Sequence, residues 1–374
     1  MTGTGTDAST SPGSAATTAA TTVTTAATTA TATTATTTAT TAATGAATGD
    51  RAAPPTAVPL DRFYDAERLA AEARALRSMT WRAQRAYGQD GLAARTEVDW
   101  RILSLRGPSG DPDRTDPGGA GLVPHADTPH LAHAPYTAEA LAGIPAPLRS
   151  VRLMALGPGA RVHEHRDGKC GYRWGALRLH IPVITNPGAV VVIGGEERHW
   201  NAGRLWFGDF DRLHYVRNDG AEPRVHLVID TMVTPALLEL FPTEFTDPLR
   251  WSEVVFAREP VPLNPAEAAS FRCGFALPAA FPDWSEEEPE GPPAPDLPGA
   301  VDVVDGRLTL LAGGEPLFAL VHLGLGEFRL EGWTEERTLH VDLASPEPRV
   351  RFRVRRGNAL SEHVRPARPI QEGP

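Results

Sequence analysis

Hydrophobic and polar residues alternate with a period of two over much of the chain after Pro147, as they do in strands that bury one face. An earlier run that begins at Trp100 has the same character. The strands predicted in this part of the chain cover residues 100–105, 151–156, 161–165, 176–183, 189–193, 204–207, 214–217 and 224–230. Short strands separated by turn residues favour a β-sandwich or barrel over a parallel sheet. We therefore expect a mainly β fold with a double-stranded β-helix (jelly-roll) core.

Helical spacing of apolar residues is confined to two stretches before this region. From Leu60 to about Ala86, apolar residues recur every three or four positions with charged residues between them, which predicts a helix with Asp61 as its N-cap. A second, short helix is expected over residues 136–143. The jelly-roll core should therefore be preceded by N-terminal helices.

Alternation returns near the C-terminus and predicts a small β-rich appendage. Its expected strands cover residues 301–304, 307–311, 317–321, 328–330, 338–343 and 350–354. The domain organisation that follows is a disordered Thr/Ala-rich tail, a core domain, a linker with a Pro/Glu-rich loop, the appendage and a flexible tail, at residues 1–57, 58–242, 243–298, 299–357 and 358–374. We expect the appendage to be a packing or dimerising module, so a homodimer is possible, and a substrate-recognition domain is the alternative.

Composition and charge exclude several classes of ligand. The formal net charge of −10 argues against nucleic acid, because phosphate binding needs a basic face. No run of about 18 apolar residues occurs, so no membrane span is expected, and the tail lacks the apolar core of a secretory signal. The two cysteines, Cys170 and Cys273, are far apart, which disfavours a disulfide scaffold or a thiolate zinc site and fits a cytoplasmic protein.

The candidate chemistry lies between residues 156 and 230. His165 and Asp167 are two positions apart, so on an extended segment they point to one side, and His214 begins another predicted strand. Two imidazoles and one carboxylate form the ligand set of a mononuclear non-haem Fe(II) oxygenase with open coordination positions. Arg224, ten residues after His214, could bind the distal carboxylate of a dicarboxylic cosubstrate such as 2-oxoglutarate.

Two further groups of residues join this hypothesis. Arg178 and His180 share one face of their predicted strand and could bind the other carboxylate of the cosubstrate. The 168–175 loop could cover the mouth of the site, with Arg173 pairing with a substrate carboxylate and Trp174 forming an apolar wall. Exposure of both as ordinary loop residues is the alternative.

A cupin metal site is the main rival. His163 and His165 also share a face, and His214-x-x-x-Asn218 matches the second cupin motif. The Glu that cupins place four to five residues after the first pair is absent, because Lys169 and Cys170 stand there. A cupin site would also give Arg224 no role. Histidines that are merely packed within a sandwich remain a further alternative.

The combined motifs resemble a known family. They run from Met154-Ala-Leu-Gly-Pro-Gly through His165-Arg-Asp, Arg178-Leu-His-Ile-Pro, Gly203-Arg-Leu-Trp-Phe and His214-x-x-x-Asn to Glu222-Pro-Arg-Val-His-Leu-Val-Ile-Asp. This region, from about residue 100 to 234, resembles the aspartyl/asparaginyl β-hydroxylases, and most closely their bacterial proline-hydroxylase-like members.

The resemblance implies an Fe(II)- and 2-oxoglutarate-dependent dioxygenase on a double-stranded β-helix. Its iron ligands would be His165, Asp167 and His214, and its cosubstrate residues would be Arg224, Arg178 and His180. Some members lack the carboxylate ligand, which is present here, and Met154 stands where some members have a serine that contacts the cosubstrate. The expected activity uses O2 to hydroxylate an amino acid, free or within a peptide. A non-catalytic iron or 2-oxoglutarate sensor is the alternative of a different class.

Overall fold

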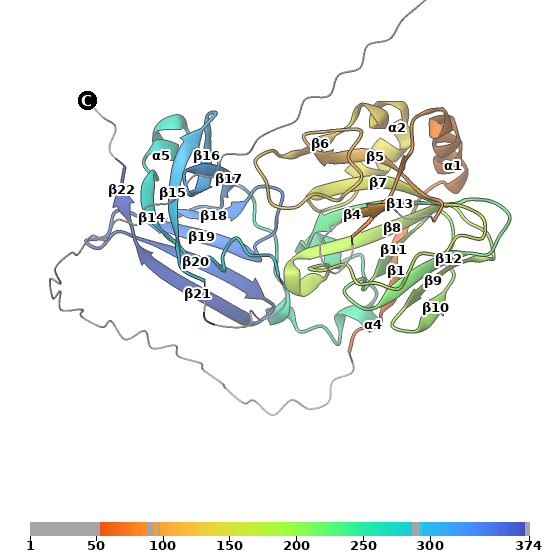
Figure 1. The fold of residues 1–374 in the computed structure, drawn as a ribbon. Helices are drawn as coiled ribbons and strands as arrows, with labels where there is room; N and C mark the ends of the chain where they lie inside the picture. Colours follow the sequence, from red (N-terminus) through yellow and green to blue (C-terminus); the bar gives the residue numbers. More distant parts are fainter. Residues whose placement is uncertain (1–52, 88–92, 96–97, 286–291, 293, 371–374) are drawn as a thin grey trace, which may run out of the picture. The chain divides into compact units, whose positions relative to one another are not determined.

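The computed structural model describes residues 53–87, 93–95, 98–285, 292 and 294–370 (Figure 1). Nearly all of the predicted disordered tail therefore lies outside the described residues. Within the described ranges, no helix has the length and apolar character needed to cross a lipid bilayer. The mainly β fold with a jelly-roll core is confirmed.

The jelly-roll core consists of a large and a small antiparallel sheet. The large sheet has the strand order β1 (Ala57–Phe63), β11 (Arg204–Gly208), β8 (Ala176–Ile184), β13 (Arg224–Met232), β7 (Leu148–Leu156), β5 (Trp100–Pro108) and β2 (Arg82–Ala83), with β6 (His125–Asp127) paired to β5. The small sheet has the order β10 (Glu196–Arg198), β9 (Ala189–Ile193) and β12 (His214–Asn218). From β8 to β13 the chain passes back and forth between the two sheets, as a double-stranded β-helix requires. A separate pair joins β3 (Arg85–Tyr87) to β4 (Ala93–Arg95).

Strand β13 shows how the sequence builds this core. All nine of its residues are buried, because one face packs against the outer helices and the other lines the barrel interior. Val225, Leu227 and Ile229 belong to the main hydrophobic cluster, together with residues of helices α1 (Ala66–Ala75) and α2 (Pro135–Ala142). The alternate residues of β13, among them His226 and Asp230, face the interior. The polar chemistry of the chain is therefore placed inside the barrel by the period of the strand.

The N-terminal helix differs from its prediction. Residues 57–63 form strand β1, which pairs with β11, and the helix begins only at Ala66. Its N-cap is Asp65, whose carboxylate accepts hydrogen bonds from the backbone N–H groups of Glu67 and Arg68 at 3.0 and 3.1 Å. The predicted cap Asp61 lies in the strand, so that assignment was wrong. The prediction of helix α2 is confirmed to within one residue.

The strand predicted at residues 161–165 is also wrong. The structure has two isolated bridges there, Arg161 to Arg217 and His165 to His214, and no continuous strand. The other strands predicted between residues 100 and 230 are present, with ends that differ by at most three residues. Short helical turns complete this half and the region that follows it: η1 (Leu76–Ser78), η2 (Pro129–His133), η3 (Tyr172–Trp174), α3 (Pro235–Leu238), α4 (Thr243–Thr246), η4 (Trp251–Glu253) and α5 (Pro265–Ala269).

The C-terminal residues form a nine-stranded antiparallel sheet, which we call the C-terminal sheet. Its order is β21 (Ala359–Pro366), β20 (Arg349–Arg356), β19 (Arg337–Asp342), β18 (Glu327–Leu330), β17 (Glu315–His322), β16 (Arg307–Ala312), β15 (Leu297–Val304), β14 (Cys273–Leu277) and β22 (Arg368–Pro369). It has a hydrophobic core of its own.

This sheet is larger than the appendage predicted at residues 299–357. Strand β14 lies in the predicted linker, and β21 and β22 lie in the predicted flexible tail, so the described part of that tail is sheet. No residue of β21 is buried, and the strand pairs with β20 along its whole length. The Glu362 carboxylate adds cross-strand ion pairs with Arg351 at 3.4 Å and with Arg353 at 2.8 Å.

Candidate metal and cosubstrate site

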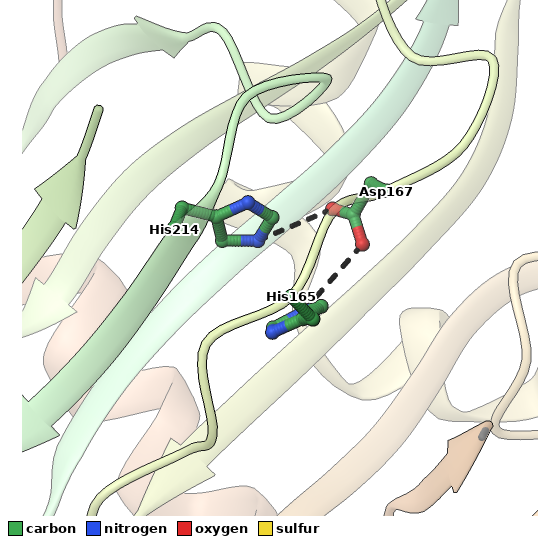
Figure 2. Close-up of side chains that lie close together, drawn as sticks. All are labelled: His165, Asp167 and His214. Atoms are coloured by element: carbon green, nitrogen blue, oxygen red, sulfur yellow. Dashed lines mark ion pairs between the residues drawn. The ribbon is translucent and has the colours of Figure 1, made fainter. Parts of the chain in front are cut away.

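His165, Asp167 and His214 converge at one end of the barrel (Figure 2). His165 and His214 exchange backbone hydrogen bonds, N to O, at 2.9 Å in both directions, and the N–H of Asp167 donates to the carbonyl of Phe210 at 2.9 Å. One Asp167 carboxylate oxygen lies 3.7 Å from His165 Nε2 and the other lies 3.8 Å from His214 Nε2. Two ligands each about 2.1 Å from a divalent ion can be at most about 4.2 Å apart, so both separations can be bridged by one ion.

Both imidazoles are oriented by the backbone. Nδ1 of His165 lies 2.8 Å from the carbonyl of His163, and Nδ1 of His214 lies 2.9 Å from the carbonyl of Arg212. Each Nδ1–H therefore donates to a carbonyl, and each Nε2 keeps its lone pair for a metal. Burial lowers the pKa of His214, which favours the neutral, ligating form. Neutral imidazoles beside a carboxylate suit a divalent first-row metal ion.

Arg178 bonds to carboxylates of the protein. Its Nη1 donates to Asp167, and its Nε donates to Asp230 at 2.6 Å. Asp230 also accepts from Arg152 Nη2 at 2.8 Å. Burial alone would raise the pKa of Asp230, but Arg178 and Arg152 outweigh it and hold that pKa below its ordinary value. Arg178 therefore holds the Asp167 carboxylate in its orientation. From the sequence we had expected Arg178 to bind the cosubstrate.

Arg224 is the opposite case, a buried cation without an anion. It begins strand β13, is 3% exposed, and has no carboxylate partner among the described residues. Burial lowers its pKa from 12.5 to about 9. Its Nη2 donates to Nδ1 of His226 at 2.9 Å. A desolvated guanidinium of this kind matches a carboxylate ligand that can bind both of its nitrogens.

His226 links Arg224 to His180. The Nδ1 atoms of the two histidines lie 3.2 Å apart. Nδ1 of His226 has a single lone pair, which accepts from Arg224. A proton on Nδ1 of His180 would share that lone pair, and Nε2 of His180 would then be left as an acceptor. That Nε2 is buried and has no hydrogen-bond partner in the described part of the chain. Burial, reinforced by Arg224, lowers the pKa of both histidines well below 6.5, so both are neutral at pH 7.

Aromatic rings join the metal end of the barrel to Arg224. The Phe210 ring lies 4.8 Å from that of His214 and 4.9 Å from that of His180, and Trp200 lies 5.3 Å from His180. Trp200 and Phe210 are almost completely buried. Sequence reasoning missed both, and it also missed His226. His226 could have been predicted, because it lies two residues after Arg224 and so shares its face of the strand.

The structure also places the residues of the cupin alternative. His163 is exposed, contributes only its carbonyl to His165, and is outside the cluster of candidate ligands. Asn218 is fully buried, and its side-chain amide donates to the carbonyls of Leu156 and Glu222 at 3.1 and 2.8 Å. Asn218 therefore secures turns and does not face a metal.

Residues 64–234, somewhat less than half of the chain, match the family model described as Aspartyl/Asparaginyl beta-hydroxylase. This region is similar to the aspartyl/asparaginyl β-hydroxylase family. The chain is 34% identical over 76 residues to "Aspartate beta-hydroxylase domain-containing protein 1" of Mus musculus and of Homo sapiens, a stretch that is 20% of this chain. It covers only about a fifth of the length of these relatives, 20% and 18%.

Solved structures match at lower identity. An oxidoreductase of the 2OG-Fe(II) oxygenase family from Burkholderia pseudomallei is 16% identical, with a TM-score of 0.32, over 47% of this chain and 84% of its own. A prolyl hydroxylase from Trichoplax adhaerens, solved with a hypoxia inducible factor peptide, is 9% identical with the same TM-score, over 47% of this chain and 83% of its own.

The β-hydroxylase match ends at residue 234, yet residues beyond it hold the 168–175 loop. Lys169 Nζ lies 3.1 Å from a carboxylate oxygen of Glu336, and both side chains are buried. The hydroxyl of Thr334 donates to the carbonyl of Trp174 at 2.5 Å, and Trp174 is 5% exposed. The C-terminal sheet therefore anchors the loop that follows Asp167.

Arg173 and Trp174 are thus placed differently from each other. Arg173 is half-exposed and pairs with Glu253 at 2.6 Å, and its carbonyl accepts from the N–H of Gly357 at 2.9 Å. Trp174 packs beneath the loop and is not an exposed loop residue. A role for either in substrate binding stays a prediction.

Proposed function

We propose that this chain is an Fe(II)- and 2-oxoglutarate-dependent hydroxylase of an amino acid side chain resembling Asp, Asn or Pro, free or within a peptide. One observation carries the proposal. His165, Asp167 and His214 meet at one end of the barrel, and buried rings connect them to Arg224, a buried cation with no carboxylate partner among the described residues. The match of residues 64–234 to the β-hydroxylase family model supports the same function.

The residues present fit both iron and the cosubstrate. His165, Asp167 and His214 would hold Fe(II), which with 2-oxoglutarate and O2 supplies the oxidising chemistry. Arg224 would bind the distal carboxylate of 2-oxoglutarate, and Arg178 would keep the Asp167 carboxylate turned toward the metal. The iron ligands and Arg224 keep the roles predicted from the sequence. Arg178 was predicted to bind the cosubstrate, and we propose instead that it positions Asp167.

The barrel interior would favour the bound cosubstrate in two further ways. The buried rings of Trp200 and Phe210 exclude water, which strengthens the electrostatic attraction between Arg224 and a carboxylate. His180, whose pKa is lowered by burial, stays neutral beside Arg224 and adds no competing positive charge.

Succinate formation tests the activity. The full chain, supplied with Fe(II) and 2-oxoglutarate under air, should produce succinate, and Asp167→Ala should abolish this turnover. His163→Ala is the matched control, because His163 is exposed and outside the ligand cluster, and it should keep most of the activity. Loss with His163→Ala and retention with Asp167→Ala would favour the cupin site instead. Tight binding of Fe(II) and 2-oxoglutarate without any succinate would favour the sensor.

A substrate screen then separates the two substrate classes. Free aspartate, asparagine and proline are compared with peptides that contain the same residues, and succinate release above the background is measured. Stimulation by peptides alone would identify a peptidyl hydroxylase, whereas stimulation by a free amino acid would support the predicted likeness to the proline-hydroxylase-like members.

A further inference from the structure

Asp230 lies in a buried network of charged side chains beside the candidate metal ligands. It is 5% exposed and stands directly opposite Arg178 in the pairing of β13 with β8. One of its carboxylate oxygens accepts from Arg178 Nε at 2.6 Å. The other accepts from Arg152 Nη2 at 2.8 Å and from the hydroxyl of Ser150 at 3.2 Å, and both of these residues belong to β7 on the other side of β13. Three donors on two oxygens hold the Asp230 carboxylate in one orientation.

Arg178 connects Asp230 to the candidate ligand Asp167. Its guanidinium donates to Asp230 through Nε and to Asp167 through Nη1. Because a guanidinium is planar and rigid, the bond from Nε to Asp230 also sets the direction of Nη1. Arg178 cannot turn away from Asp167 without breaking its bond to Asp230.

The backbone around Asp167 leaves its side chain free to turn. This segment is not a strand, because a single bridge joins His165 to His214 and the N–H of Asp167 donates to Phe210. The carboxylate is only partly buried. Among the described residues, Arg178 is the one side chain that donates a hydrogen bond to it. The orientation of Asp167 therefore depends on Arg178.

The two oxygens of Asp167 are not equivalent. The oxygen that accepts from Arg178 lies 3.8 Å from His214 Nε2, and the other lies 3.7 Å from His165 Nε2 (Figure 2). A carboxylate can ligate an ion through one oxygen or through both. Ligation through both would take a position that a chelating cosubstrate and O2 need on a six-coordinate ion. A charge-assisted bond from Arg178 to one oxygen favours ligation through the other.

We propose that Asp230 is a positioning residue for the metal site, which holds Arg178 so that Asp167 ligates the ion through a single oxygen. This inference rests on the proposed function for the presence of the ion, but ion binding can be measured without turnover. Asp230 is outside the group of candidate ligands and acts through Arg178. Its effect should therefore depend on the hydrogen bond to Arg178 and not on its charge alone.

Co(II) binding to the metal-free full chain tests the proposal, because the visible absorption of bound Co(II) reports the number and arrangement of its ligands. The test variant is Arg152→Met/Asp230→Leu, which removes one positive and one negative charge and so keeps the net charge beside the metal site. Replacing a buried ion pair by apolar residues of similar size is often neutral for folding. Co(II) affinity should fall about tenfold or more, as is typical when a residue that orients a metal ligand is lost. The visible absorption should change as well.

Two related variants separate positioning from charge and folding. Arg152→Met/Asp230→Asn has the same net charge but keeps a side-chain carbonyl that can accept from Arg178 Nε. Its Co(II) affinity and absorption should lie between those of the leucine variant and the native chain. Arg152→Met is the matched control, because Arg152 bonds to Asp230 and, among the described residues, to neither Arg178 nor Asp167. Its Co(II) affinity and absorption should stay close to native. Urea unfolding of each metal-free protein measures its stability.

Three results would overturn the proposal. These are native affinity and absorption in a folded Arg152→Met/Asp230→Leu chain, an equal loss of affinity in Arg152→Met, or an equal loss in both double variants. If the leucine variant does not fold, native affinity and absorption in the asparagine variant overturn the proposal instead.

Succinate release separates this proposal from the proposed function. Co(II) binding that depends on Asp230, in a chain that never releases succinate, contradicts the proposed function but keeps the positioning role. Succinate release by a chain whose Co(II) binding is insensitive to Asp230 contradicts the positioning role alone.

Discussion

Replacing Arg224 by methionine should improve or preserve folding while removing the cosubstrate. The pKa of Arg224 falls from 12.5 to about 9 because the charge is buried. At about 1.4 kcal/mol for each tenfold change, holding this charge without an anion disfavours folding by roughly 5 kcal/mol. A base whose folded pKa is depressed carries this cost fully at pH 7, where both the folded and unfolded forms are protonated, and loses it only above about pH 9.

Methionine removes that cost at similar volume and gives up one hydrogen bond to His226, which is worth about 1 kcal/mol. The free energy of unfolding of the metal-free protein should therefore stay the same or rise in Arg224→Met. The affinity for 2-oxoglutarate should fall about 30-fold or more, because the loss of a buried charge pair with a carboxylate costs roughly 2–5 kcal/mol.

Urea unfolding with and without 2-oxoglutarate measures both effects, with Mn(II) in place of Fe(II) to prevent turnover. Cosubstrate at a hundred times its dissociation constant should stabilise the native chain by about 2.7 kcal/mol and should not stabilise the variant. Arg149→Met is the matched control. Arg149 is also buried, with a pKa lowered to about 10, but its Nε donates to the carbonyl of Gly332 at 3.0 Å. Its replacement should leave the 2-oxoglutarate affinity unchanged.

The reasoning fails if Arg224→Met lowers stability by several kcal/mol and keeps its affinity for 2-oxoglutarate. Arg224 would then be a structural cation whose partner is the protein itself. Equal loss of 2-oxoglutarate affinity in Arg149→Met would also refute it, because the effect would then follow from burying any arginine and not from the position of Arg224.

The proximity of the candidate ligands could be predicted because it depends on local chain geometry. His165 and Asp167 need only an extended segment, and His214 needs only the neighbouring strand of the barrel. The segment is not a strand, yet the single bridge between His165 and His214 keeps it extended and preserves the expected side. A pattern of residues two apart is insensitive to whether the segment forms one bridge or a full ladder.

The partners of the charged residues could not be predicted in the same way. Arg178 lies opposite Asp230 in the register of β8 with β13, and the two are 52 residues apart in sequence. From the sequence, Arg178 was expected to be free to bind the cosubstrate, because the residues near it in sequence do not reveal the register between β8 and β13. Lys169 and Glu336 are a longer-range case, at 167 residues apart, and Glu336 is fully buried although a charged residue in a loop is ordinarily exposed.

The predicted start of the N-terminal helix was wrong for a related reason. The apolar residues of the 60–86 stretch fit helical spacing, but Leu60 is fully buried in a strand that pairs with β11, about 140 residues away. Asp61 and Asp65 are both acceptable helix caps by residue type. Pairing with β11 determined that the chain stays extended past Asp61, and this tertiary constraint has no local signature.

Two further predictions concern stability and the metal loop. Burial lowers the pKa of His125 to about 4, so the unfolded chain binds a proton that the folded chain does not between pH 6.5 and 4. Stability should fall by roughly 3 kcal/mol as the pH falls through this window, and His125→Gln should flatten the profile in urea unfolding; equal slopes would contradict this. Glu336→Gln removes the charge that faces Lys169 and Arg337 in a buried site. Breaking such a pair costs roughly 3–5 kcal/mol, because the cations remain buried. Since Lys169 lies in the 168–175 loop directly after the candidate metal ligands, anaerobic Fe(II) titration should also show weaker binding. Lys169→Met in the same background should recover part of the stability, because it removes one of the two buried cations that Glu336 faces, but it should not recover Fe(II) affinity, because the loop still lacks its anchor. Unchanged Fe(II) affinity in a clearly destabilised Glu336→Gln protein would show that the loop is held independently of the C-terminal sheet.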